Sequence, residues 1–385
     1  MSHVGTTTRR ITTLLATTAL VATPLVTLGA APATSSGRTW KLEATGLDNP
    51  RDLVWTKSTL YVAEAGSGGS GPCLTSAEGE EVCFGTTGAL AHVRNGHVTR
   101  VVTGLPSLAA ADGSAAIGPS DVVLGPGRRY VLTIGLGNDP AVRSQLPDAG
   151  QLMGTVAKGH ASEYWGTKPK APSGKAPKAV ADLAAYEAAT NPDGGLPDTN
   201  PTGMLLDHGG WTVADSGGNS VVKARPDGTV STLAVIGSPG SAASPFPPHP
   251  VIPMQSVPTS VVRGPDGAYY VSELTGFPFA KGAARIIRIT KSGTQSVWAT
   301  GLTNVTDIEW FDGSLYAVQL ATDGLLSAQG LPMGSFVKVN PGGAPTVIAA
   351  DLPAPYGLTF GRSKAWVTTC SVCAAGGSIV SIPLP

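Results

Sequence analysis

The sequence contains little charge of either sign. Lys and Arg together number 26, Asp and Glu also number 26, and charged residues make up 14% of the 385 residues, so the formal net charge is zero. Nucleic-acid binding depends on clustered Lys and Arg that neutralise phosphates. The composition therefore argues against nucleic acid as a partner. With 42% hydrophobic residues, the chain is also too apolar for an intrinsically disordered protein.

Several common catalytic motifs are absent. The sequence contains no G-x-S-x-G, no H-E-x-x-H and no P-loop. Its six histidines are scattered, without a pairing that indicates a metal site. His92 and His97 flank a turn, and we expect both to be solvated. No reaction class can therefore be assigned from a motif.

Cysteine is scarce, but its number is even. The four residues are Cys73, Cys83, Cys370 and Cys373. In an exported chain an even number indicates disulfides, and four cysteines allow three pairings. We predict Cys73–Cys83 and Cys370–Cys373, because nearest-neighbour pairing closes short loops. A redox or zinc role for the Cys-Ser-Val-Cys segment is the alternative, although a redox CxxC usually opens a helix and this one follows a strand.

The N-terminus has the layout of a secretory signal. Arg9 and Arg10 precede an apolar stretch, residues 11–30, and Ala31-Pro32-Ala33 is an A-x-A cleavage site. We predict Sec-type export with cleavage after Ala33, no membrane span in the mature chain, and a secreted, monomeric product. A membrane anchor is the alternative. It is disfavoured because threonines dilute the segment and no stop-transfer pattern follows.

Glycine and proline are abundant and occur throughout the chain. The 50 Gly and 32 Pro separate short apolar runs, which predicts many short strands. Beyond residue 33 one phrase recurs: a start residue, an apolar strand, a Gly-rich turn, an aromatic strand and two further strands. The copies begin at Pro50, Pro119, Pro201, Pro258, Val305 and Pro355.

This repeat predicts an all-β fold, a six-bladed β-propeller in a single domain of residues 34–385. The last copy is one strand short, and TWKLEATGL (39–47) has the form of the missing strand. Pairing with SIVSIPLP (378–385) would close the ring and leave no open sheet edge. A pair of β-sandwiches is disfavoured, because sandwiches do not repeat a whole strand-turn-strand phrase. Among the insertions, residues 181–194 read as a short helix and 167–177 as a Pro- and Lys-rich surface loop.

Several long phrases resemble a known family. They are GLDNPRDLVW (46–55), GEEVCFGTTGAL (79–90), VADLAAYEAATNPDG (180–194) and VPTSVVRGPDGAYYVSELTGFPF (257–279). From about Trp40 onward the chain is similar to the ScyD/ScyE family of exported bacterial proteins. Some members of that family are encoded in gene clusters for the pigment scytonemin, and the resemblance implies no particular activity. The repeat is more distantly similar to NHL and gluconolactonase-type propellers, whose lactonases hold a divalent metal with Glu, Asn and Asp at the channel mouth.

A polar residue ends the second strand of every repeat. The aligned residues are Glu64, Thr133, Asp215, Glu273, Gln319 and Thr369. In a propeller these strands end at one face, so the six side chains are predicted to surround one end of the channel. We consider them candidates for ligand binding. The alternative for each is a structural role, in which the side chain satisfies nearby backbone groups.

The first strands supply a second set of small or acidic residues: Asp52, Asp121, Gly203, Ser260, Asp307 and Gly357. Small side chains suit the crowded axis of a propeller. Carboxylates gathered at one mouth repel each other unless they are protonated, paired or bound to a cation. Because carboxylate oxygens suit Ca²⁺ or another divalent cation, the candidate metal ligands are Asp52, Asp121, Asp307, Glu64, Asp215 and Glu273. Arg51 is the expected counter-charge.

The loops beyond these positions supply weaker candidates. Asn138, Asp139 and Asn219 closely follow the ring positions, and turn formation is their alternative role. Phe277 and Phe279 stand on the corresponding loop of the fourth repeat, where they would stack on a ligand or pack over the blade.

Two classes of function fit these observations. The first is a secreted ligand-binding or scaffold propeller, without catalysis, whose polar and acidic site takes a small molecule or an extracellular partner. The alternative is a metal-dependent hydrolase of the lactonase kind, in which a cation polarises a carbonyl and a carboxylate acts as base. The Asn ligands implied by the lactonase resemblance have no counterpart at the aligned positions, where Thr133, Gln319 and Thr369 stand. We therefore favour binding and leave enzymatic activity undecided.

Overall fold

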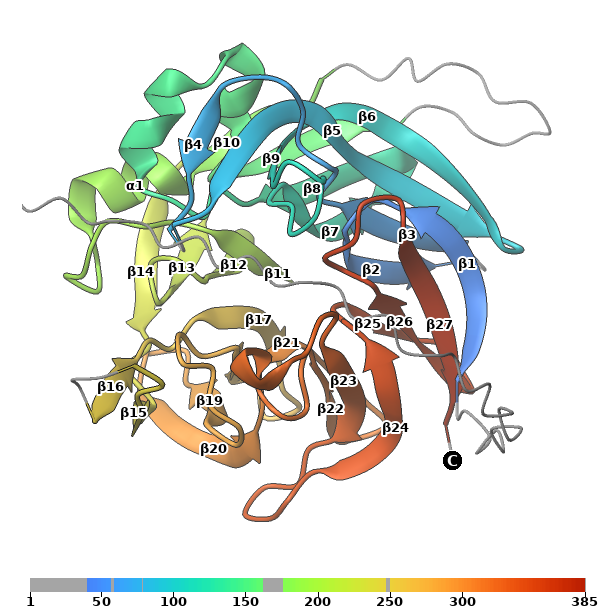
Figure 1. Ribbon diagram of the computed structural model, residues 1–385, viewed down its shortest axis with the longest axis vertical. Coiled ribbons are helices and arrows are strands. Elements are labelled where there is room, and N and C mark those ends of the chain that lie inside the picture. Colours follow the sequence, from blue (N-terminus) through green and yellow to red (C-terminus); the bar gives the residue numbers. More distant parts are fainter. Residues whose placement is uncertain (1–39, 57–58, 78, 162–175, 247–249, 385) are drawn as a thin grey trace, which may run out of the picture. The chain divides into compact units, whose positions relative to one another are not determined.

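The computed structural model describes residues 40–56, 59–77, 79–161, 176–246 and 250–384. The predicted signal segment 1–33 and most of the predicted surface loop 167–177 lie outside the described residues. The described chain forms a ring of β-sheets around a central axis (Figure 1). It is a six-bladed β-propeller, which confirms the predicted fold class. Among the described residues, no helix is both long and apolar enough to cross a membrane.

The first three blades follow one another along the chain, each beginning with its innermost strand. Blade 1 contains β2 (Pro50–Thr56), β3 (Thr59–Glu64), β5 (Glu81–Arg94) and β6 (His97–Ala109), with the short β4 (Cys73–Thr75) also paired to β5. Blade 2 contains β7 (Pro119–Gly125), β8 (Arg129–Ile134), β9 (Thr155–His160) and β10 (Lys178–Asp182). Blade 3 contains β11 (Pro201–Asp207), β12 (Gly210–Asp215), β13 (Ser220–Ala224) and β14 (Val230–Val235).

The remaining blades repeat this order. Blade 4 contains β17 (Pro258–Arg263), β18 (Tyr269–Glu273), β19 (Ala284–Ile289) and β20 (Gln295–Leu302). Blade 5 contains β21 (Val305–Phe311), β22 (Ser314–Gln319), β23 (Met333–Lys338) and β24 (Thr346–Pro353). Blade 6 contains β25 (Leu358–Phe360), β26 (Lys364–Thr369), β27 (Gly377–Pro383) and β1 (Lys41–Leu47).

The other elements are short insertions between strands. A hairpin precedes blade 4, and one α-helix and several 3₁₀ turns lie in the connections. They are β15 (Gly240–Ala243), β16 (Val251–Met254), α1 (Leu183–Thr190), η1 (Pro126–Arg128), η2 (Pro140–Gln145), η3 (Asp148–Leu152) and η4 (Leu325–Ser327). Helix α1 begins where the Asp182 carboxylate accepts the Ala185 N–H at 2.9 Å and ends at Asn191, whose φ of 38° is left-handed. This confirms the helix predicted in 181–194.

The ring closes between the two ends of the described chain. Strand β1 pairs antiparallel with β27, from Lys41 opposite Ser381 to Leu47 opposite Gly377. Figure 1 shows the blue β1 beside the red β27. Leu47 is fully buried in this pairing and Ala44 nearly so. The closure predicted from the missing strand is therefore confirmed.

The hydrophobic core is divided among the interfaces between successive blades. A separate cluster of buried side chains occupies each interface around the ring. Between blades 4 and 5, for example, the Tyr270 ring meets Trp298 and Trp310 edge-on, with 5.1 Å between centroids in both pairs. Edge-to-face contacts of this kind are favourable for aromatic rings. The second strands are covered on both faces, which explains their continuous apolar sequences.

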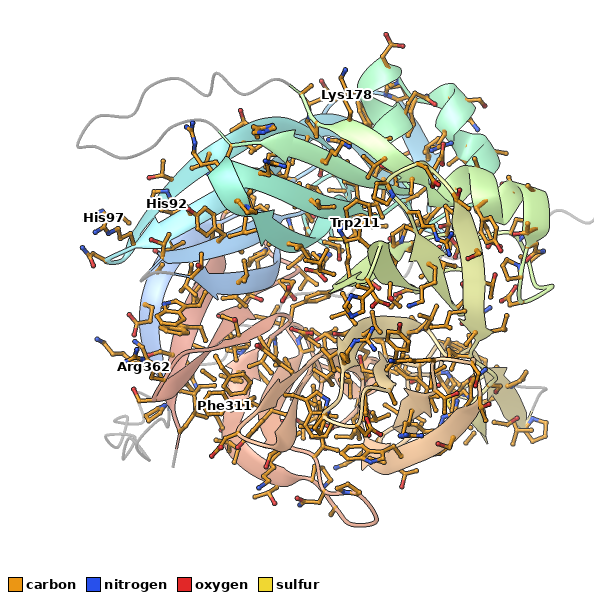
Figure 2. All side chains as sticks on the ribbon, turned by 180° about the vertical axis from the view of Figure 1, so that it is seen from behind. His92, His97, Lys178, Trp211, Phe311 and Arg362 are labelled. Atoms are coloured by element: carbon orange, nitrogen blue, oxygen red, sulfur yellow. A yellow bond between two sulfur atoms is a disulfide. The ribbon has the colours of Figure 1, made fainter. Side chains whose placement is uncertain are left out.

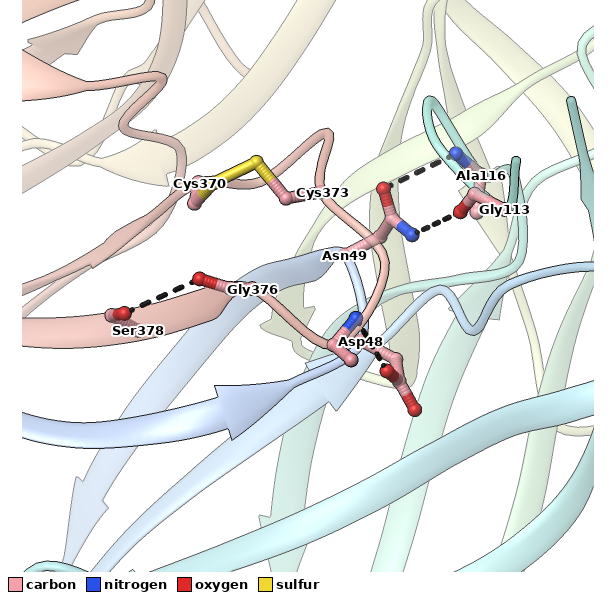
Figure 3. Close-up of a disulfide and its surroundings, with 9 residues drawn as sticks. Asp48, Asn49, Gly113, Ala116, Cys370, Cys373, Gly376 and Ser378 are labelled. Atoms are coloured by element: carbon pink, nitrogen blue, oxygen red, sulfur yellow. Dashed lines mark hydrogen bonds between the residues drawn. A yellow bond between two sulfur atoms is a disulfide. The ribbon is translucent and has the colours of Figure 1, made fainter.

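Both predicted disulfides are present. Cys73 and Cys83 join β4 to β5, where the two residues are directly opposite in the strand register. Cys370 and Cys373 close the turn that follows β26 (Figure 3). No cysteine is free, so the nearest-neighbour pairing is confirmed.

Candidate functional site

The six polar residues at the second-strand ends are buried. None of Glu64, Thr133, Asp215, Glu273, Gln319 and Thr369 is more than 4% exposed. In four blades the side chain accepts a hydrogen bond from the linker that enters the same blade. The pairs are Asp48 N–H to Glu64 at 2.8 Å, Asn200 N–H to Asp215 at 2.7 Å, Ser256 Oγ–H to Glu273 at 2.8 Å, and Thr303 N–H to Gln319 at 2.7 Å.

Thr133 plays a related part in blade 2, where its hydroxyl donates to the Thr202 carbonyl of blade 3 at 2.6 Å. These contacts are structural, because they fasten a linker or a neighbouring blade. A role in ligand binding for the six residues stays a prediction.

Glu64 and Glu273 are each paired with an arginine from another strand of the same blade, β6 for Glu64 and β19 for Glu273. Arg100 donates to Glu64 through Nη2 at 2.7 Å and through Nε at 3.0 Å. Arg285 donates to Glu273 through Nε at 2.8 Å, through Nη2, and through its backbone N–H at 3.1 Å. Fork-shaped pairing of this kind suits a buried carboxylate, which is costly to desolvate alone. The two glutamates therefore have their own counter-charges and do not join the aspartates of the axis.

Asp52, Asp121 and Asp307 do come together at the axis, from the innermost strands of blades 1, 2 and 5. Burial raises the pKa of all three, and the neighbouring Asp307 and Asp121 raise the pKa of Asp52 further. The Asp52 carboxyl lies within hydrogen-bonding reach of the other two, yet its Oδ1 has no hydrogen-bond donor among the described residues. A carboxyl group that faces two carboxylates and lacks a donor is expected to hold a proton.

The other two aspartates fasten adjacent blades. The Met204 N–H of blade 3 donates to Asp121. The Leu358 N–H of blade 6 donates to Oδ2 of Asp307 at 2.8 Å, and the Ser260 hydroxyl of blade 4 donates to its Oδ1 at 2.7 Å. Oxygen atoms of both carboxylates therefore already accept hydrogen bonds within the protein.

A divalent cation held by these three aspartates stays a prediction. A cation site needs several carboxylate oxygens that can turn to one point. Among the described residues, one group of three carboxylate, imidazole or thiol ligand atoms has all its members within 4.8 Å of one another: Cys73, Glu81 and Cys83. Its two sulfur atoms are joined in a disulfide. The aspartates of the axis do not form such a group.

Arg51 does not serve as the counter-charge of these aspartates, so that prediction was wrong. Its Nη2 donates to the Ala116 carbonyl, and its guanidinium lies 4.7 Å from the centroid of the Tyr356 ring.

Glu309 is a further buried acid near the axis that no pattern in the sequence indicated. It lies two residues beyond Asp307 and on the same side of β21. Burial, and to a smaller extent Asp307, raise the pKa of Glu309 to about 8.

Steric crowding accounts for the small residues of the first strands. A Cβ atom on Gly203 would lie 2.6 Å from Cα of Ser260, and one on Gly357 would lie 2.6 Å from Cα of Asp52. Side chains at these positions would force neighbouring blades apart. The axis therefore requires glycine there.

A groove of about 710 Å³ opens on the face where the second strands end. It is formed by the loops after β8, β12 and β18 together with the linkers before β11 and β17. Its polar lining is Asn138, Asp139, Asp198, Asn200, Ser216 and Gln255. Its apolar lining includes Leu196, Phe277 and Phe279. Ser216 and Leu274 directly follow the buried Asp215 and Glu273, so the groove lining begins one residue beyond the predicted ring.

Four of the weaker candidates line this groove: Asn138, Asp139, Phe277 and Phe279. Asn219 does not. It is 6% exposed, and its amide bonds Asp193 at 2.9 Å and the Val257 N–H at 3.0 Å, which is the expected turn role.

The groove walls are held by specific contacts. The Asn138 amide donates to the Thr75 carbonyl at 2.7 Å, which ties this wall to the hairpin of the Cys73–Cys83 disulfide. Asp139 accepts the Ala141 N–H at 2.8 Å and begins η2. On the opposite wall the Phe277 ring is stacked on Phe246 at 6.0 Å and meets Phe279 edge-on at 6.1 Å.

An acidic cluster lies beside Asp198, at the blade 3 end of the groove. Glu187 of α1 is 2% exposed, and its Oε1 has no hydrogen-bond partner among the described residues. Burial raises the pKa of Glu187 to about 7, with further contributions from Asp215, Asp193 and Asp198. Sequence reasoning missed this cluster, because it depends on how the α1 insertion folds back onto the turn after β12.

Two glycines make room for this cluster. A Cβ on Gly217 would lie 2.7 Å from Oδ1 of Asp198, and one on Gly218 would lie 3.1 Å from Oε2 of Glu187. The Gly-Gly pair after Asp215 therefore lets two carboxylates approach the backbone closely.

A network around Asn49 organises the mouth beside the second disulfide. The Asn49 amide nitrogen donates to the Gly113 carbonyl at 2.8 Å (Figure 3). It also donates to the Gly66 carbonyl at 2.7 Å, and the Asn49 backbone N–H donates to the Cys373 carbonyl at 3.1 Å. Asn49 is fully buried. It joins the Cys370–Cys373 turn, the entry to blade 1 and the loop before blade 2.

The opposite side of the molecule has a separate cavity of about 590 Å³ between blades 1 and 2, lined in part by Tyr61, His92 and Leu124. His92 and His97 lie on blade 1 near the β5–β6 turn (Figure 2). His97 is exposed, as expected. His92 is half-buried with its ring centroid 6.1 Å from that of Tyr61, so the expectation that it is solvated was wrong.

Comparisons with known proteins agree on the fold. No protein-family model and no curated protein sequence matches this chain. Among solved structures, it is similar to a luciferin-regenerating enzyme, with a TM-score of 0.50 and 11% identity over 90% of this chain and 96% of that one. A protein of unknown function from Bacteroides thetaiotaomicron has a TM-score of 0.48 and 10% identity over 90% and 72%. At 11% identity, the similarity to the luciferin-regenerating enzyme concerns the fold alone.

Proposed function

We propose that the chain is an exported ligand-binding propeller of the ScyD/ScyE type, and that the groove at its mouth is the binding site. The observation that carries this proposal is the combination of polar and aromatic groups in one cleft. Asp139, Asp198 and Gln255 contribute polar side chains to the lining, and Phe277 and Phe279 contribute apolar surface.

The size and build of the groove suit a small molecule. Pockets for small ligands usually enclose roughly 300–1,000 Å³ and combine apolar walls with a few convergent polar groups. The groove, at about 710 Å³, lies in this range. Its walls are braced by the Cys73–Cys83 hairpin, by η2 and by the aromatic stack, and a preorganised site loses less entropy when a ligand binds.

The lining supports binding rather than nucleophilic catalysis. It contains no Cys, His or Lys among the described residues. Ser216 is 7% exposed, and its hydroxyl donates to the Pro258 carbonyl at 2.6 Å. A serine nucleophile needs a base within hydrogen-bonding reach, and this hydroxyl is instead committed to the backbone.

A ligand-observed NMR screen tests the proposal. The chain is screened against a panel of fragment-sized cations, neutral compounds and anions, in parallel with the variant Gln255→Trp. Gln255 is exposed, so the larger side chain should enter the groove without disturbing the fold. We expect compounds that bind the unmodified chain and lose binding in the variant. Hits that bind both proteins equally, or the absence of any hit, would overturn the proposal.

The alternative is a metal-dependent hydrolase that uses the aspartates of the axis. One observation favours it: Oδ1 of Asp52 is buried and lacks a hydrogen-bond donor. The melting temperature, measured with Ca²⁺, Mg²⁺, Mn²⁺ or EDTA, distinguishes a cation bound by these aspartates from a proton shared among them. A ligand at 100 times its dissociation constant adds about 2.7 kcal/mol of stability. A rise with one cation that disappears in Asp52→Asn would support this function, and an unchanged melting temperature would contradict it.

A further inference from the structure

We propose that the mouth groove takes a small organic cation, an amine whose flat apolar part lies against Phe277 and Phe279 and whose ammonium group lies beside Asp139 and Asp198. This inference rests on the groove being the binding site and goes further by naming the class of ligand.

The charge of the lining is one-sided. Asp139 and Asp198 both contribute to it, and no Lys, Arg or His is present among the described lining residues. An anion in the groove would lie near these two acidic side chains, and like charges repel each other, which makes its binding unfavourable. A cation would meet two acidic side chains and the side-chain amide of Gln255.

The protein behind the groove adds to this field. Near Asp198 lie three further acids, Glu187, Asp193 and Asp215. The pKa of Glu187 is raised mainly by burial and to a smaller extent by the three aspartates. Charges of one sign near a cleft raise the local concentration of ions of the opposite sign. The field therefore favours cations at the blade 3 end.

The aromatic wall favours the same ligand. The Phe277 ring is parallel to Phe246 within 2° and meets Phe279 at 85°. Phe279 and Phe277 are both half-buried and both line the groove. Aromatic faces attract cations and stack on flat apolar groups. An amine that carries an aromatic ring uses both properties.

Three probes of similar size separate charge from shape: 2-phenylethylamine, 2-phenylethanol and 3-phenylpropionate. Their dissociation constants are measured by ligand-observed NMR at low and high NaCl. We expect the amine to bind about tenfold more tightly than the alcohol, equivalent to about 1.4 kcal/mol. High salt should remove much of this preference, because ions screen exposed charges. The carboxylate should bind most weakly.

Variants assign the preference to the groove. Asp139→Asn and Asp198→Asn should each reduce the preference for the amine and leave the alcohol unchanged. Asp139 is exposed, so its substitution should not unfold the chain. Asp323→Asn is the control, since Asp323 pairs with Lys281 on the surface and does not line the groove.

The outcomes separate this inference from the proposed function. If the alcohol or the carboxylate binds as tightly as the amine, and Gln255→Trp abolishes that binding, the groove is a binding site and the cation inference is wrong. The inference is also wrong if no probe binds while other panel compounds do. Amine binding that survives Gln255→Trp would contradict both.

Discussion

At the residue scale, the acids that end the second strands act through their hydrogen bonds. Glu64 and Glu273 are fully buried, where an unpaired carboxylate would be strongly disfavoured. Arg100 and Arg285 supply the opposite charge, and the linker into the same blade supplies a further donor. An acid at the end of an apolar strand therefore fixes the point at which the chain passes from one blade to the next.

Replacing Glu273 by Ala should lower the free energy of unfolding by about 3 kcal/mol, because it leaves the Arg285 guanidinium without its carboxylate in a largely buried site. Denaturant unfolding followed by circular dichroism measures this change. The control is Asp323→Ala, which breaks the exposed pair with Lys281 and should cost less than about 1 kcal/mol. Equal losses in the two variants would contradict a structural role for Glu273.

Glu309 gives a prediction for pH. Its pKa is about 8 in the folded protein against an ordinary value of 4.5. Between these values the folded chain binds more protons than the unfolded chain, so the free energy of unfolding should fall as pH rises from 5 to 8. Gln is neutral at every pH, so Glu309→Gln should make this decline shallower by at least about 1 kcal/mol. Parallel declines in the two proteins would contradict the raised pKa.

At the scale of the elements, strand β1 closes the ring by pairing with β27. It comes from the start of the described chain and supplies the outer strand of blade 6. Without it, β27 would present an open edge, and open edges promote association with other chains. Along β1 the inward and outward side chains differ sharply, since Leu47 is fully buried and Leu42 is 52% exposed.

This contrast gives a matched pair of variants on one strand. Leu47→Ala should lower the free energy of unfolding by about 3 kcal/mol, because it leaves a cavity in the interface of blades 6 and 1. Leu42→Ala should change it by less than about 0.5 kcal/mol. Thermal and denaturant unfolding compare the two. Similar small effects at both positions would mean that β1 does not close the ring.

Most of the fold, but only part of the candidate site, could be predicted from the sequence. The repeated phrase predicted the blades and the missing strand predicted the closure, because both follow from local turn and strand patterns. The arginine partners of Glu64 and Glu273 come from β6 and β19, and such a pairing depends on strand register and side-chain direction. Asp198 and Glu187 depend on the fold of an insertion that has no repeat. Asn138 and Phe277 could be anticipated, since they follow positions that the repeat fixes.

At the scale of the whole molecule, the residues of the axis hold the blades together, and the loops at the mouth form the groove. The aspartates of the axis fasten neighbouring blades, as Asp121 does for blade 3 and Asp307 for blade 6. The loops of blades 2, 3 and 4 at the mouth form the groove. A rigid ring that carries variable loops at one face is a common arrangement for ligand binding.

The most direct test of this account is an isothermal titration with the tightest compound from the fragment panel. It is added to the unmodified chain and to Gln255→Trp, under the same buffer and temperature. We predict saturable binding with one site per chain in the first protein and at least tenfold weaker binding in the second, or about 1.4 kcal/mol. Equal affinity in the two proteins, with both still folded by circular dichroism, would contradict the groove as the binding site.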